Sequence, residues 1–102
     1  MTIQQQLVSA SADAIDIFTQ QNRKAVVSGG HVPIHQGDTF VIDCDTNKIR
    51  IAVATLNQHP QLFSIGVQAK QTGAPLVPEK MLPISDLNAS TLLKYMDAHF
   101  YK

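Results

Sequence analysis

Two histidines and a carboxylate in one short segment are the residues best suited to chemistry. His31, His35 and Asp38 lie in the stretch HVPIHQGD. Two imidazoles and a carboxylate can bind a divalent metal facially and leave positions open for a substrate. A spacing of four would put both histidines on one helix face, but Pro33 between them argues against a helix. A small-molecule or metal-binding protein that uses the His31–Asp38 loop is therefore kept as an alternative function.

The single cysteine is the other residue that could react. Cys44 stands between Asp43 and Asp45, and neighbouring negative charges disfavour the thiolate that a nucleophile needs. Alternation also turns Cys44 to the same side as the apolar residues before it, which favours a buried structural thiol. The serines lack the glycine frame of a nucleophile elbow. We predict no catalytic residue and no cofactor, and we favour a non-enzymatic protein over an enzyme.

The segment Gln36–Ala54 must position these residues, and its pattern predicts a β-hairpin. Two alternating apolar runs flank a turn over 45–48, where Asp and Asn favour turn backbone. A further alternating strand is expected over 62–69, and a short strand over 25–28 ending at the turn Gly29-Gly30. Segment 31–38, with Pro33 and Gly37, is interpreted as a loop or an irregular edge segment, and segment 55–61 as a connection. Segment 70–83 contains Gly73 and three prolines, which exclude an interior strand; a loop folded over the core is favoured over an edge hairpin or arm.

Helical periodicity marks both ends of the chain. Apolar residues gather on one side of Ile3 to about Asn22, with Thr2 as a plausible N-cap, and they recur again from Ala89 to Phe100. The predicted fold is α+β: an N-terminal amphipathic helix, a three- to four-stranded mainly antiparallel sheet that could curl into a small barrel, and a short C-terminal helix. The whole chain, 1–102, is expected to be a single domain.

Composition limits the classes of partner. Eight basic and eight acidic residues cancel, and charged residues are only 16% of the chain, so there is no global field to attract a polyanion. Nucleic-acid binding would have to use a small basic set, and this is the weaker alternative. Its members are Arg23, Lys24, Lys48, Arg50 and Lys70. No stretch is apolar enough to span a membrane, and the absence of a secretory pattern predicts a cytoplasmic protein.

The predicted sheet has a second face that is only partly polar. Small or uncharged residues predominate there, which favours contact with another chain. The residues predicted to form this interface are Val41, Arg50, Ala52, Ala54 and Leu62. The function favoured by the sequence is a small non-catalytic protein-binding or assembly domain, an accessory, inhibitor or subunit protein, that self-associates as a homo-oligomer.

Overall fold

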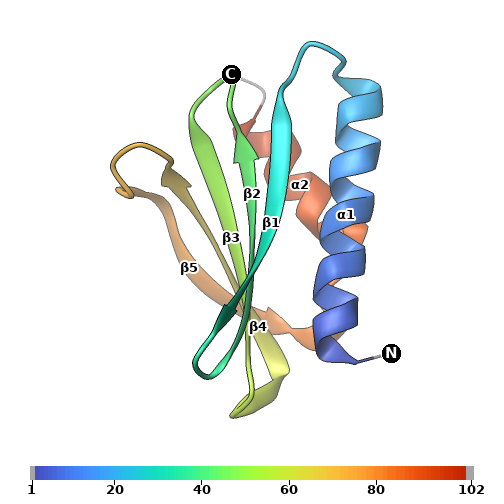
Figure 1. Ribbon diagram of the computed structural model, residues 1–102, viewed down its shortest axis with the longest axis vertical. Helices are drawn as coiled ribbons and strands as arrows, with labels where there is room; N and C mark the ends of the chain where they lie inside the picture. The colour runs from blue at the N-terminus through green and yellow to red at the C-terminus, as the bar shows by residue number, and fades with distance from the viewer. Residues whose placement is uncertain (1, 101–102) are drawn as a thin grey trace.

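The computed structural model describes residues 2–100. The chain forms two α-helices and a five-stranded antiparallel open sheet, an α+β arrangement (Figure 1). In chain order the elements are α1 (Ile3–Gln21), β1 (Val27–Ile34), β2 (Gly37–Cys44), β3 (Ile49–Leu56), β4 (His59–Ala69), β5 (Pro75–Pro83), the 3-10 turn η1 (Ile84–Asp86) and α2 (Ala89–His99). No helix within residues 2–100 is long and apolar enough to cross a membrane.

The sheet is a simple meander in which each strand pairs with the next, in the order β1-β2-β3-β4-β5. The expected helix, sheet and helix order is therefore confirmed, but the count of three or four strands is too low. The curled barrel is wrong: β1 and β5 do not pair, so the sheet stays open with an edge at each side. Each edge strand leaves backbone donors and acceptors without a partner strand.

The first strand is longer than the one predicted over 25–28. Gly29 and Gly30 lie inside β1 rather than in a turn, and β1 runs on to Ile34, where a loop or an irregular edge segment was expected. Gly29 fits because a Cβ there would lie 2.6 Å from Ile15 Cδ1 and 2.7 Å from Phe40 Cε1. The absence of a side chain thus lets α1 pack close against the strand.

Two further connections are shorter than expected. β3 continues to Leu56 and β4 begins at His59, so most of segment 55–61 is strand. Pro75–Pro83 forms β5 rather than a loop folded over the core. Its three prolines are tolerated because β5 is an edge strand, where an absent N–H breaks fewer ladder bonds.

Both helices cover the same face of the sheet (Figure 1). Thr2 caps α1 with a capping box, accepting a hydrogen bond from the Gln5 backbone N–H. Gln6 then donates to the carbonyls of Ile84 and Leu87, which ties α1 to the segment before α2. The core between the layers is formed by fully buried apolar side chains from every layer, including Leu7, Phe18, Ile42, Cys44, Ile51, Val53, Phe63, Ile65, Leu92 and Met96. The burial of Cys44 confirms that it is part of the core.

Candidate functional site

The face of the sheet that the helices do not cover is the candidate site, and we call it the open face. Val41, Ala52 and Ala54 lie on it, because they alternate with Phe40, Ile51 and Val53, which point into the core. Arg50 and Leu62 lie on it by the same alternation. The whole predicted interface set therefore shares one face of the sheet.

Register places the side chains of the open face in rows that run across the strands. The first row is Val32, Thr39, Ala54, Ser64 and Met81, one residue from each strand. The second row is Gly30, Val41, Ala52 and Gly66. The first row contains no charged side chain, whereas in the second row Glu79 of β5 lies against Gly66, where a Cβ would be 3.2 Å from Glu79 Cγ. The first row is therefore an uncharged strip that crosses all five strands of the sheet.

Residues at the two ends of the first row are the more exposed apolar ones. Val32 is 47% exposed on β1 and Met81 is 46% exposed on β5, and Leu62 on β4, the strand next to Met81, is 37% exposed. Between them lie Ala54 and Ser64, which have small side chains. An antiparallel sheet face that is in contact only with water normally carries polar side chains. This strip, with Val32, Ala54 and Met81, differs from that pattern.

A third row of side chains, at one end of the open face, is charged. Arg50 donates two hydrogen bonds to the Asp43 carboxylate, at 2.7 Å from Nε and 3.0 Å from Nη2. Lys70 Nζ hydrogen-bonds Asp45 and lies 3.6 Å from Asp43 Oδ2. These two acids and two bases neutralise each other locally. The pairing explains how Asp43 can be only 8% exposed while carrying a carboxylate.

Hydrogen bonding shifts the pKa values of the three outer members of this cluster. The Lys70 hydrogen bond lowers the pKa of Asp45, and the Asp45 hydrogen bond raises the pKa of Lys70. The Asp43 hydrogen bond raises the pKa of Arg50. Each shift favours the charged form of its group.

The structure brings together two of the three proposed metal ligands. His31 Nε2 and Asp38 Oδ1 are 2.8 Å apart across the β1–β2 pair, on the helix-covered side of the sheet. His35 lies exposed in the turn that joins the two strands. Among residues 2–100 no group of three or more His, Cys, Asp or Glu side chains is arranged to hold a metal ion. The His31–Asp38 contact is accounted for as a cross-strand hydrogen bond.

The basic residues proposed for nucleic acid gather at one end of the molecule but have different partners. Arg50 and Lys70 are paired with carboxylates in the charged row. Lys48 lies in the β2–β3 turn with a φ of 58°. Arg23 and Lys24 lie between α1 and β1, and within residues 2–100 neither makes a hydrogen bond or ion pair. The set therefore does not form one unpaired basic stripe.

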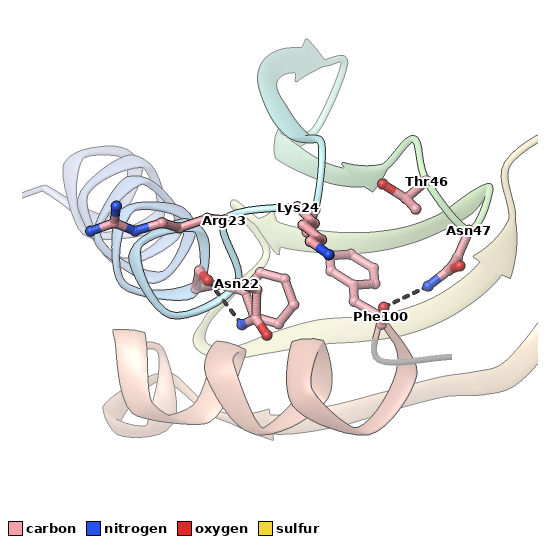
Figure 2. A pocket seen from close by; sticks show the side chains of 8 residues that line it. Asn22, Arg23, Lys24, Thr46, Asn47 and Phe100 are labelled. Carbon is pink, nitrogen blue, oxygen red and sulfur yellow. Dashed lines mark hydrogen bonds between the residues drawn. The ribbon is translucent and has the colours of Figure 1, made fainter.

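A pocket of about 370 Å³ lies beside Arg23 and Lys24, between the end of α1, the β2–β3 turn and Phe100. Figure 2 shows Lys24 reaching over it while Arg23 points away. Two of its polar side chains already serve the fold: Asn22 donates to the Phe18 carbonyl, and Asn47 donates to the Phe100 carbonyl. Both bonds are to carbonyls at helix ends, so Arg23 and Lys24 are the charged groups that the pocket offers to a ligand.

No protein-family model, no curated protein and no solved structure matches this chain. The function proposed below therefore rests on the geometry of the chain itself.

Sequence reasoning missed the two ends of the uncharged strip. Val32 was assigned to a loop or an irregular edge segment and Met81 to a proline-rich loop, so neither was included in the interface. The signal that could have found them is alternation across the glycines and prolines: Gly30 and Val32 alternate with Gly29 and His31 as the residues of a strand do.

Proposed function

We propose that this protein is a non-catalytic protein-binding domain, and that the open face of its sheet receives an amphipathic helix of another protein. One observation carries the proposal: a cross-strand row that spans all five strands of an uncovered sheet face contains no charged side chain. Apolar surface that stays in water costs about 25 cal/mol per Å² relative to burial. A partner that covers the strip removes that cost.

The shape of the strip favours a convex partner. Its middle is built from the small residues Thr39, Ala54 and Ser64, while Val32 and Met81 lie at its ends. Five strands spaced at about 4.8 Å give a face about 19 Å across, and a helix with its side chains is about 10 Å wide. An apolar helix stripe can therefore rest on the small residues between the larger side chains, which is a recurring mode of recognition.

Charge also selects the partner. The row of Asp43, Arg50 and Lys70 is internally paired at one end of the strip. A strongly charged partner gains nothing from these neutralised groups, and it would have to lose water to lie against the uncharged strip. The proposed partner is therefore a helix with an uncharged apolar stripe. Nucleic acid is the less favoured ligand, because Arg50 and Lys70 are already paired.

Site-specific photocrosslinking tests the proposal in the cells from which the chain comes. A benzophenone amino acid is introduced at Ala54, in the middle of the open face, and in a second variant at Ala98, which is exposed on α2. We expect the crosslinker at position 54 to yield a covalent adduct with a second protein through a helical segment. The same group at position 98 should yield none, which makes it the matched control.

Competition shows whether the adduct reports specific binding. Excess unlabelled wild-type protein should suppress the adduct from position 54, whereas an Ala52→Lys variant should compete at least about tenfold less well, because a charge is then buried in the contact. Equal competition by both proteins, or no adduct from position 54, would overturn the proposal. An adduct only with another copy of this chain would do so as well, since the partner would then be the protein itself.

A further inference from the structure

The two edges of the sheet are protected to different degrees. β5 carries Pro75, Pro78 and Pro83 together with Glu79 and Lys80, and prolines and charges are the usual means by which proteins stop an edge from pairing. β1 has the sequence VSGGHVPI, with no Asp, Glu, Lys or Arg, and its one proline is Pro33 near the end. From Val27 to Val32 the β1 edge has no such protection.

The helix above β1 also presents an uncharged side. Successive helix residues turn by about 100°, so Gln6 and Val8 lie on opposite sides of the buried Leu7. Gln6 faces the segment before α2, to which it is hydrogen-bonded. The opposite side points past β1, away from α2, and carries Val8, Ala12, Ile15 and Thr19.

These four residues have the spacing of a helix–helix contact. They recur at intervals of four, three and four residues, which is the spacing of a packing seam. Ala12 is exposed, and the other three are half-buried. Ile15 contacts the site of Gly29, so the middle of this helix side lies level with the middle of the unprotected strand. We call the two together the β1 side of the molecule.

We propose that the β1 side pairs with the same side of a second copy of this chain, joining β1 to β1 antiparallel and α1 to α1 across a two-fold axis. The inference is independent of the proposed function, because the open face is a different surface. Figure 1 shows α1 beside β1 at this side of the sheet, with β5 at the other.

The spacing of the layers supports a second copy as the occupant. α1 packs chiefly over β1 and β2. When the two β1 strands pair across the axis, the two α1 helices therefore lie about two strand spacings apart. Two strand spacings are about 9.6 Å, which falls within the interaxial distance of about 8–10 Å for packed helices. Strand pairing and helix packing are thus satisfied by one arrangement. A lone strand from another protein would pair with β1 but leave the α1 seam uncovered.

The contact area is sufficient for a specific dimer. α1 has 19 residues, which at 1.5 Å per residue make it about 28 Å long. A helix layer on a strand layer is about 20 Å deep, so the β1 side offers about 560 Å² per partner. The total of about 1,100 Å² exceeds the size of about 1,000 Å² that a biological interface should clear. It lies near the lower limit, so the dimer is expected to exchange with monomer.

Sedimentation analysis over a range of concentrations tests the pairing. We expect a monomer–dimer equilibrium for the wild-type protein. For Ala12→Glu we expect a dimer dissociation constant at least about tenfold higher, because the axis brings the two negative charges together. Ala98→Glu makes the same change at an exposed site on α2 and should leave the equilibrium unchanged. Ala12 is exposed in the monomer, so the variant should fold, as circular dichroism can verify.

Two further measurements locate the contact. Ala12→Cys should give a disulfide-linked dimer on mild oxidation while Ala98→Cys does not; Cys44 is buried and does not compete. Hydrogen exchange of the β1 amides should slow as protein concentration rises. A monomer at all concentrations would overturn the inference. So would a dimer that Ala12→Glu leaves intact, and dissociation by Ala52→Lys instead would assign self-association to the open face.

Discussion

Gly37 begins β2 at a point where the neighbouring strand comes too close for any side chain. A Cβ there would lie 1.9 Å from the Thr55 carbonyl oxygen and 2.9 Å from its carbon. These are backbone atoms of the paired strand, so they cannot move aside as the end of a side chain would. The glycine is required for this close approach.

We therefore predict that Gly37→Ala lowers the free energy of unfolding by about 3 kcal/mol, the upper end of the usual cost of overpacking. Gly30→Ala is the control, because a Cβ at Gly30 would meet nothing within 4 Å. Urea unfolding followed by circular dichroism measures both. Equal midpoints for the two variants would show that the β2–β3 contact relaxes without cost.

Ser11 is a polar residue in the core. Its side chain is fully buried, and its hydroxyl has no hydrogen-bond partner within the described residues. An unsatisfied buried hydroxyl costs about 1–3 kcal/mol. We predict that Ser11→Ala raises the free energy of unfolding by about 1 kcal/mol more than Ser9→Ala, which makes the same change at an exposed position of α1. A gain no larger than that of the Ser9 control would indicate that the hydroxyl is satisfied in solution.

Single residues also show what local pattern can and cannot reveal. The burial of Cys44 and the N-cap role of Thr2 followed from alternation and capping chemistry. The His31–Asp38 contact did not, because it depends on the register of two strands that the sequence did not pair. His31, His35 and Asp38 were proposed together because they are close in the sequence, but the pairing of β1 with β2 determines that only His31 and Asp38 meet.

At the scale of elements, the Asp45–Lys70 pair links the end of β2 to the end of β4. The pKa of Asp45 lies below its usual value of 3.8, chiefly because Lys70 donates a hydrogen bond to it. A lowered folded-state pKa contributes stability above the ordinary pKa, and that stability is lost as pH falls through the folded value. The pKa of Lys70 is raised from 10.5, so the stability that Lys70 contributes persists until pH rises through that raised pKa.

We predict that Asp45→Asn destabilises the protein near neutral pH, and that the difference from wild type shrinks as pH falls below about 4. The effect should be modest because the pair is solvent-accessible. Unfolding free energies measured across this range test the prediction, with Asp97→Asn on α2 as an exposed control. A difference that stays constant with pH would mean that Asp45 acts through turn geometry instead of charge.

The elements that were predicted correctly are those with a strong local period. The α1 and α2 helices, the β2–β3 hairpin and the middle of β4 each repeat their apolar residues at the interval of the structure they form. β5, and the part of β1 beyond Ser28, were missed because glycine and proline usually mark turns. Here Gly29 makes room for Ile15, and the prolines of β5 lie at an edge; both reasons are tertiary.

At the scale of the whole molecule, the uncovered second sheet face could be predicted, but its extent could not. The helices were expected to cover one face, so alternation alone placed Val41, Ala52 and Ala54 on the other. The width of the uncharged strip depends on Val32 and Met81, which the register of the edge strands brings into line with Ala54. Only the assembled sheet defines that row.

The prolines of β5 also set a limit on growth. If β1 joins β1, the outer strands of the combined ten-stranded sheet are both β5, and each carries Pro75, Pro78 and Pro83. Neither offers a continuous ladder to a third molecule. The symmetry is closed, and strand addition stops at two copies where an unprotected edge would propagate into a filament. The three prolines that made β5 difficult to predict from the sequence thus also stop strand addition at the dimer.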